Sequence, residues 1–247
     1  MKTLSRRTVA DDSGRPVFSY VEGTREGRPY ADLVEVLGPG APELILRELP
    51  GWVVSGDEEL GRLLLTAGAR PLRHAHGMSR DLRADPAPAE WAETGHGIVA
   101  CDAVPAAEVF PAWRAAYPPG HPDHQARDDD AATAELAPLL AGRSYGPMLP
   151  CGGLLLRDDR VVAGVLVGEL RGEPPSGGPW VLDVFRDPSP EFAGLGAVML
   201  RRALALATLH GLPALGLAVT EGNPARRVYE RLGFRLVSSS ITVIVPG

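Results

Sequence analysis

The residues whose types and spacing suggest chemistry lie in the last quarter of the chain. Gly194 and Gly196 flank Leu195 immediately before an apolar stripe of helical periodicity. Glycines let the backbone approach a ligand closely, and the N–H groups of a first helical turn face that ligand with the helix dipole behind them. The turn therefore predicts a phosphate-binding site. Close packing of a helix on a sheet would use the same glycines.

Two common nucleotide-binding motifs do not fit this turn. A dinucleotide-binding turn would have a third glycine where this chain has Met199, and an acidic residue would close the following strand. The sequence has no P-loop lysine here either. The phosphate prediction therefore depends on the residues around the turn.

Those residues resemble GCN5-related N-acetyltransferases, the GNAT superfamily. The family's Gln/Arg-x-x-Gly-x-Gly/Ala pattern falls on residues 191–196, which read EFAGLG. Its Asn-x-x-Ala-x-x-(Leu)-Tyr-Glu-x-x-Gly-Phe pattern resembles residues 223–234, which read NPARRVYERLGF. The match is closest over residues 180–234 and extends more loosely upstream to about Ile98. Two such patterns in this order are hard to obtain by chance.

The resemblance implies a fold and a donor. The expected class is α+β, arranged α/β/α: the GNAT fold, with a mixed, mostly antiparallel central sheet flanked by helices. The expected co-substrate is acetyl-CoA or another acyl-CoA, with no metal. The expected reaction is transfer of the acyl group to a primary amine by direct attack in a ternary complex.

The resemblance also implies which residues hold the donor. In this family the strand before the helix diverges from its neighbour, so the backbone of Val184 and Phe185 is free to bond pantetheine and the thioester oxygen. Such N–H donors contribute several kcal/mol in a transition state. Asn223 is the position that lines the cofactor, although helix capping would explain it as well. The pyrophosphate is expected at the turn and helix start, formed by Glu191, Ala193, Gly194, Leu195, Gly196 and Ala197.

Tyr229 is the residue expected to act as the acid. A phenol with a pKa near 10 keeps its proton at neutral pH, whereas a thiol has a pKa of about 8.5. Tyr229 can therefore protonate the sulfur as it leaves. The alternative is a half-buried aromatic side chain on the helix face shared with Ala225 and Leu232.

Glu191 departs from the family pattern, which has glutamine or arginine there. A carboxylate about 4 Å from a pyrophosphate oxygen costs roughly 1 kcal/mol in water-like surroundings and more if buried. Either this side chain turns to solvent or the donor is held less tightly. Three nearby cations could compensate: Arg186, Arg201 and Arg202.

The acceptor side is less well defined. Asp183 lies on the strand that lines the acceptor channel in this family, and we expect it to be the base that takes the amine's proton. Glu169 and a water chain are the alternatives. Tyr117, His121 and His124 lie in the proline-rich loop after the first helix, where we expect substrate contacts. Their spacing matches no tight metal site, and an ordinary surface loop explains them too.

Hydrophobic periodicity gives the elements that must position these residues. Helical spacing predicts helices at 105–117, 131–140 and 194–210. Gly211 fits the left-handed position that ends the last of these. Asn223 and Pro224 predict the N-cap and first residue of a fourth helix. Short apolar runs predict strands at 153–157, 161–169, 180–186, 214–219 and 241–245, with a hairpin turn at 158–160.

The N-terminal part of the chain looks like a degenerate copy of its C-terminal part. Residues 52–55, 57–67 and 72–78 predict strand, helix and strand, and Gly68 aligns with Gly233. In this alignment Leu64 stands at the position of Tyr229, and Glu58 stands at the position of Asn223. The copy therefore cannot carry out the same chemistry. A generic strand–helix–strand unit explains this equally well. We expect a degenerate half-GNAT-like segment at 1–83, a Pro/Ala-rich linker at 84–90 and a GNAT domain at 91–247.

Composition narrows the remaining choices. The 247 residues are 45% hydrophobic and 23% charged, as in soluble globular proteins, and no stretch approaches eighteen uncharged apolar residues. The net charge of −6 argues against a nucleic-acid binder, and two cysteines favour a cytoplasmic location. The expected partner is a small-molecule amine, with no nucleic acid and no membrane, and the sequence leaves open whether the chain forms a homodimer. A non-catalytic CoA-binding module and a protein-modifying acetyltransferase remain alternative functions.

Overall fold

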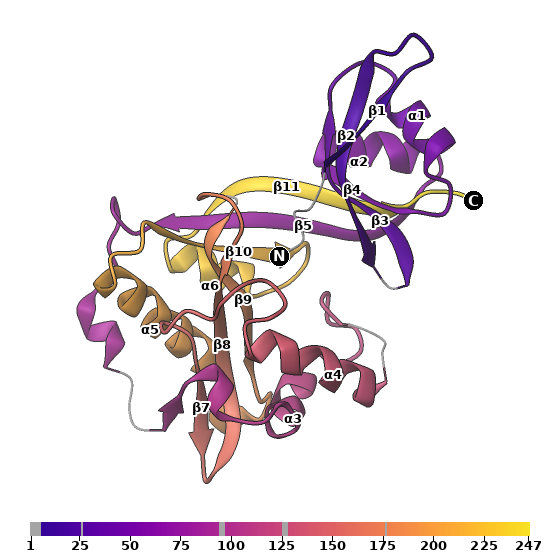
Figure 1. Ribbon diagram of the computed structural model, residues 1–247. Helices are drawn as coiled ribbons and strands as arrows, with labels where there is room; N and C mark the ends of the chain where they lie inside the picture. Colours follow the sequence, from indigo (N-terminus) through magenta and orange to yellow (C-terminus); the bar gives the residue numbers. More distant parts are fainter. Residues whose placement is uncertain (1–5, 26, 94–96, 125–127, 176) are drawn as a thin grey trace. The chain divides into compact units, whose positions relative to one another are not determined.

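The computed structural model describes residues 6–25, 27–93, 97–124, 128–175 and 177–247. The chain divides into two units (Figure 1). Unit 1 comprises Met1–His76 and Ser238–Gly247, and unit 2 comprises Gly77–Val237. The boundary falls within two strands, β5 (Arg70–Asp81) and β11 (Arg235–Ile244), so the chain's last ten residues belong to unit 1.

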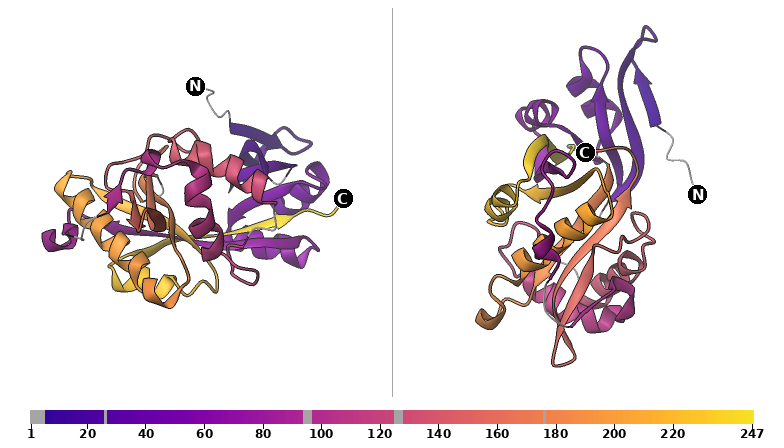
Figure 2. Two further views of the ribbon diagram at one scale, coloured as in Figure 1. Left: turned by 90° about the horizontal axis from the view of Figure 1, so that it is seen from below. Right: turned by 90° about the vertical axis from the view of Figure 1, so that its left-hand side faces the viewer.

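Unit 2 has helices on both faces of a mixed sheet (Figure 2). Antiparallel pairing joins β6 to β7, β7 to β8 and β8 to β9, and β9 pairs with β10 in parallel. Its elements are β6 (Ile98–Val99), α3 (Ala106–Ala116), α4 (Asp129–Leu140), β7 (Gly153–Arg157), β8 (Arg160–Leu170), β9 (Gly178–Arg186), α5 (Leu195–Leu209), β10 (Ala214–Thr220) and α6 (Arg226–Arg231).

Alternating side chains of β8 explain these layers. Val165 and Val167 pack in the core beneath α5, whereas Leu166 joins a second core that includes Val109 of α3 and Leu136 of α4. A sheet buried on both faces needs apolar residues on both, and all eight residues from 161 to 168 are buried. The expected α+β class and GNAT fold, a mixed, mostly antiparallel sheet flanked by helices, are confirmed.

The helices and strands predicted for residues 91–247 are all present, although several boundaries differ. Helix α6 begins at Arg226, because the Asn223 side chain accepts a hydrogen bond from the Ala225 N–H and holds the preceding residues in a turn. Strand β11 begins at Arg235, six residues before the predicted start. Its first four residues are exposed, including the apolar Leu236 and Val237.

The residues predicted as a linker, 84–90, lie within unit 2 and contact its helices. Ala87 is buried, and its N–H donates to the Thr208 hydroxyl at 3.1 Å. The Trp91 ring lies within 6 Å of two guanidinium carbons, those of Arg80 at 5.7 Å and Arg201 at 5.8 Å. A polar, Pro/Ala-rich composition therefore accompanies a segment that packs across α5.

Helix α5 is a long and largely apolar helix. With the turn before it, the segment Pro190–Leu209 is long and apolar enough to span a membrane by length and composition alone. Arg201 and Arg202 interrupt this segment, so it is not a run of eighteen uncharged apolar residues. In the structure its residues Met199, Leu200, Ala203 and Leu204 are fully buried in the core of unit 2.

Unit 1 contains three strands and a helix that the sequence pattern did not predict. Strands β1, β2 and β3 are antiparallel, β3 pairs with β4 in parallel, and residues 240–244 of β11 pair with β4. The strand, helix and strand predicted from residue 52 onward are confirmed as β4, α2 and β5. The unit's elements are β1 (Arg6–Ala10), β2 (Pro16–Arg25), β3 (Arg28–Val36), α1 (Ala41–Glu48), β4 (Val53–Asp57) and α2 (Glu58–Thr66).

From β7 onward, the elements follow the same order as β1 to β5, and the helices α2 and α6 end in the same way. Each series has three antiparallel strands, a helix, a parallel strand, a short helix and a final strand. After α2, Gly68 has a φ of 97°, and the Ala69 N–H donates to the Leu64 carbonyl. After α6, Gly233 has a φ of 84°, and the Phe234 N–H donates to the Tyr229 carbonyl. This geometry supports the alignment of Gly68 with Gly233.

Candidate active site

The start of α5 has the geometry that the glycine turn predicts. Gly194 is the N-cap residue with a φ of 85°, a left-handed conformation that disfavours any residue with a Cβ. A Cβ at this position would meet no atom within 4 Å, and one at Gly196 would only touch Val184 Cγ1 at 3.7 Å. Close packing on the sheet therefore requires neither glycine. Backbone conformation explains Gly194, and room beside the helix start remains at Gly196.

Helix geometry leaves the N–H groups of Leu195, Gly196 and Ala197 without carbonyl partners in their own helix, because the first internal bond runs from Val198 to the Gly194 carbonyl. These three residues are partly exposed, and Ala193 and Gly194 are exposed. The helix start is thus open to a ligand. Unpaired N–H groups and the helix dipole together suit a pyrophosphate, so this end of α5 fits the expected donor.

Glu191 lies in the short 3-10 turn Pro190–Phe192 and is exposed. Of the two outcomes expected for this carboxylate, the structure shows the one in which it faces solvent. The three candidate cations do not converge on the turn. Arg201 stacks on Trp91, Arg186 donates to the Asp187 carbonyl at 2.7 Å, and one buried guanidinium nitrogen of Arg202 has no partner among the described residues.

Strands β9 and β10 separate where the family resemblance implies. Their parallel pairing joins Trp180 to Gly216 and Val181 to Leu217, and within the described residues it goes no further. On its other side β9 stays paired with β8 up to Arg186, with an irregularity opposite Leu166 and Val167. The backbone of Val184 and Phe185 is therefore not paired with β10 in the described residues. The Phe185 side chain itself is buried in the core on the α3 side.

Tyr229 lies on α6 with its ring packed edge-on against Phe234 at 6.1 Å. It is partly buried against the core under α5, as the structural alternative expects. Its hydroxyl, however, has no hydrogen-bond partner among the described residues. Burial, and then the charges of Asp183 and Asp123, raise the pKa of Tyr229 above its usual value. The phenol therefore stays protonated and lies in the electrostatic field of two carboxylates.

Asp183 accepts hydrogen bonds from two side chains of α3 and its C-terminal end. The Trp113 indole N–H donates to Oδ2 at 2.7 Å, and the Tyr117 hydroxyl donates to Oδ1. Burial raises the pKa of Asp183 above its usual value, against the opposing effect of these two donors. The Asp183 carboxylate is therefore a stronger base than the carboxylate of an exposed aspartate. A base for an amine proton needs this property.

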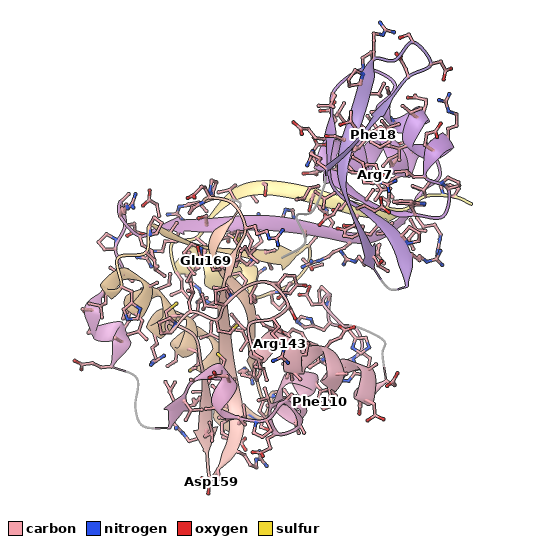
Figure 3. All side chains as sticks on the ribbon, viewed as in Figure 1. Arg7, Phe18, Phe110, Arg143, Asp159 and Glu169 are labelled. Carbon is pink, nitrogen blue, oxygen red and sulfur yellow. The ribbon has the colours of Figure 1, made fainter. Side chains whose placement is uncertain are left out.

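Glu169, the alternative base, lies elsewhere. It is exposed at the end of β8 (Figure 3), whereas the carboxylates that act on Tyr229 are Asp183 and Asp123. Asp183 is thus the better placed of the two carboxylates with respect to Tyr229.

The loop after α3 folds back on Tyr117. The His121 ring meets the Tyr117 ring edge-on at 5.2 Å, and His124 Nδ1 donates to the Tyr117 carbonyl at 2.8 Å. The Asp123 N–H donates to His121 Nδ1 at 3.1 Å. Both predicted histidines therefore support the loop through their Nδ1 atoms.

Asp123 is a site residue that the sequence analysis missed. Its carboxylate accepts hydrogen bonds from the Asn223 amide at 2.8 Å and from the Thr220 hydroxyl. It therefore connects the loop after α3 to the end of β10 and the turn before α6. The position of an aspartate between two histidines was the only signal in the sequence, and no local pattern indicated partners about a hundred residues away.

Asn223 uses both ends of its side chain within the protein. Oδ1 accepts from the Ala225 N–H at 2.8 Å, and Nδ2 donates to Asp123. The capping role is thus present in the structure. Any contact with the donor would depend on the second amide hydrogen of Nδ2.

Comparison with known proteins agrees with this geometry. The family model described as the acetyltransferase (GNAT) family matches residues 107–234, more than half of the chain. No curated protein matches the chain significantly.

Several solved structures have a similar fold. A GCN5-related N-acetyltransferase from Sphaerobacter thermophilus has a TM-score of 0.65 at 17% identity, covering 99% of this chain and 82% of that one. A GCN5-related N-acetyltransferase from Kribbella flavida has a TM-score of 0.53 at 19% identity, covering 98% and 90%. A tandem GNAT protein from the clavulanic acid biosynthesis pathway has a TM-score of 0.56 at 14% identity, covering 94% and 79%. At these identities the likeness concerns the fold alone, whereas the family model covers the residues of unit 2 that form the site. The chain therefore belongs to the GNAT acetyltransferase family.

Proposed function

We propose that unit 2 is an N-acyltransferase that moves an acetyl group from acetyl-CoA to a primary amine by direct attack in a ternary complex. The observation that carries this proposal is the Tyr229 hydroxyl. It has no hydrogen-bond partner among the described residues, and it lies in the field of Asp183 on β9, the strand whose described pairing with β10 ends at Val181.

The donor would bind along two backbone segments. The N–H groups of Leu195, Gly196 and Ala197 would hold the pyrophosphate at the start of α5. The backbone of Val184 and Phe185, unpaired on the side facing β10, would bond the pantetheine amides and orient the thioester oxygen. An N–H group fixed at that oxygen stabilises the charge that develops there as the amine attacks.

The proton transfers would divide between two side chains. Tyr229 holds a proton at neutral pH and would give it to the departing sulfur. Asp183, which burial makes more basic than an exposed aspartate, would receive the proton that the amine loses. Asp123 would hold the acceptor loop in place through Thr220 and Asn223.

An acyl-cysteine intermediate has no support in the structure. Cys101 and Cys151 are buried, and burial raises their thiol pKa values to about 12 and about 11. The nucleophilic form of a cysteine is its thiolate, which is scarce at neutral pH under these conditions. Direct transfer is the simpler route.

Two alternatives predict different results. A non-catalytic module would bind CoA without turnover, and Glu191 in place of the family's glutamine or arginine favours it. A protein-modifying enzyme would acylate a lysine in a peptide better than a free amine. Turnover of acetyl-CoA with a panel of amines and lysine peptides, for the wild type and Tyr229→Phe, separates these functions. If CoA binds but no acceptor is acylated faster by the wild type than by the variant, the enzyme proposal is wrong.

A further inference from the structure

We propose that Tyr117 relays the acceptor's proton to Asp183, so that the base acts through a phenol and not directly on the amine. This inference rests on the proposed acyltransferase function, and it assigns to Tyr117 a catalytic role beyond substrate contact.

The hydrogen bonds around Asp183 favour a relay. Both carboxylate oxygens already accept a donor from α3 or its C-terminal end: Oδ2 from the Trp113 indole, and Oδ1 from the Tyr117 hydroxyl. The Tyr117 hydroxyl has one proton, which it gives to Asp183, so its remaining lone pair is available to accept a proton from a third group. The Val184 carbonyl is a second, more distant acceptor for the same hydroxyl proton at 3.2 Å, which places Tyr117 beside the backbone expected to hold the thioester.

The surroundings keep Tyr117 protonated, as a relay requires. Burial, the charge of Asp183 and the hydrogen bond to it raise the pKa of Tyr117 well above its usual value, and Tyr229 and Asp123 add to the effect. His121 meets its ring edge-on, and His124 bonds its carbonyl. These are the titratable groups that face Tyr117 from the sheet, from α6 and from its own loop.

The proposed step balances without another reactant. The nitrogen lone pair of a neutral amine forms a bond to the thioester carbon, and the amine proton passes to the Tyr117 oxygen. The original Tyr117 proton moves to Asp183 Oδ1. As the carbon–sulfur bond breaks, the sulfur takes the proton of Tyr229. The proton on Asp183 then returns to Tyr229 through solvent, and the products are the amide and the free thiol.

The test compares two substitutions that each remove one donor from Asp183. Tyr117→Phe removes the relay, whereas Trp113→Phe removes only the other hydrogen bond. We expect Tyr117→Phe to lower kcat by about a hundredfold with unchanged CoA affinity, and Trp113→Phe to lower it by less than about tenfold. Equal losses in the two variants, or an undiminished kcat in Tyr117→Phe, would overturn the relay.

A second readout separates proton relay from simple positioning. The wild type and Tyr117→Phe are assayed with the best acceptor found in the amine panel and with its less basic fluorinated analogue. Because a less basic amine loses its proton more easily in the reaction, the loss caused by Tyr117→Phe should shrink for the fluorinated acceptor. A loss of equal size for both acceptors would show that Tyr117 only positions Asp183, and would overturn the proposal.

A third variant covers the case in which Tyr117→Phe does not fold. Fluorotyrosine at position 117 keeps the hydroxyl but makes the phenol more acidic, and we expect a changed kcat with unchanged CoA binding and thermal midpoint. An unchanged kcat would contradict the relay. Wild-type protein without turnover toward any acceptor would instead contradict the proposed function itself.

Discussion

Asp123 and Asn223, one hundred positions apart, are joined by a hydrogen bond of 2.8 Å between a carboxylate oxygen and an amide nitrogen. The bond ties the loop after α3 to the turn that starts α6. Since α6 contains Tyr229 and the loop begins at Tyr117, this contact fixes the proposed acceptor loop relative to the proposed acid. The Thr220 hydroxyl adds a second bond to the same carboxylate.

Replacing Asp123 should therefore affect both stability and acceptor binding. In Asp123→Ala, Asn223 and Thr220 lose a common acceptor, and we expect a loss of about 1–3 kcal/mol in the free energy of unfolding. The KM for the amine should rise more than the KM for acetyl-CoA, because we propose that the loop contacts the acceptor. Denaturant unfolding and steady-state kinetics measure the two effects. Asp123→Asn, which keeps one acceptor oxygen, is the control and should lose less; an unchanged amine KM in Asp123→Ala would contradict the assigned role.

The two glycines at the start of α5 should respond differently to substitution. Gly194→Ala forces a Cβ into a left-handed conformation, and we expect it to cost about 1–2 kcal/mol of stability. Gly196→Ala has room for its methyl group and should leave stability unchanged or raise it. The larger Gly196→Val should weaken CoA binding without unfolding unit 2. Thermal unfolding and CoA titration of the three variants test this contrast. Equal melting temperatures for Gly194→Ala and Gly196→Ala would refute it.

The pH dependence of the reaction should report on Asp183. Its pKa is raised in the folded protein, and it must be ionised to accept a proton, so kcat/KM should rise as pH increases through that raised value. The same shift contributes stability that is present below the ordinary aspartate pKa and is lost as pH rises through the folded one. Asp183→Asn should thus lose activity. As pH rises from acidic to neutral, the wild type should lose stability that the variant keeps, so the stability of the variant relative to the wild type should increase. Parallel pH profiles of activity and of unfolding for both proteins check this. If kcat/KM falls at low pH in Asp183→Asn as it does in the wild type, this carboxyl is not the group responsible.

Glu191 should weaken donor binding only modestly. Its carboxylate is exposed, so water and salt screen its repulsion of a pyrophosphate. We expect Glu191→Gln to tighten CoA binding by a factor of about 2–5 at low salt, with a smaller effect at high salt. Calorimetric titration at two salt concentrations measures this. Weaker binding by the glutamine variant would mean that Glu191 contacts the donor favourably.

Much of unit 2 could be predicted because its elements follow simple local rules. The stripe that includes Met199, Ala203 and Leu204 gives α5, and Gly211, with a φ of 71°, ends it as expected. Asp158 and Asp159 both have positive φ values, which the hairpin between β7 and β8 requires. The glycine turn and Tyr229 were recognisable because the sequence around them resembles the patterns of the GNAT superfamily.

The rest depended on contacts between distant residues. Strands β1 to β3 escaped prediction because charged and polar residues occupy many of their positions. The composition of residues 84–90 suggested a linker, yet Arg80 reaches across this segment to donate to the Leu232 carbonyl at 2.9 Å. A Cβ at Gly233 would lie 2.9 Å from Asp85 and 3.1 Å from Arg80, so this glycine also makes room for that pair. Asp123 likewise became a site residue only through Thr220 and Asn223.

The most direct test of the account is the effect of Tyr229→Phe on the chemical step. The substitution removes one hydroxyl that has no hydrogen-bond partner among the described residues, so it should preserve the fold and the affinity for CoA. With the best acceptor of the panel, we predict a kcat lowered by about a hundredfold, measured as the rate of free thiol release. A kcat within about twofold of the wild type, with CoA still bound, would show that Tyr229 is not the acid and would contradict the proposed mechanism.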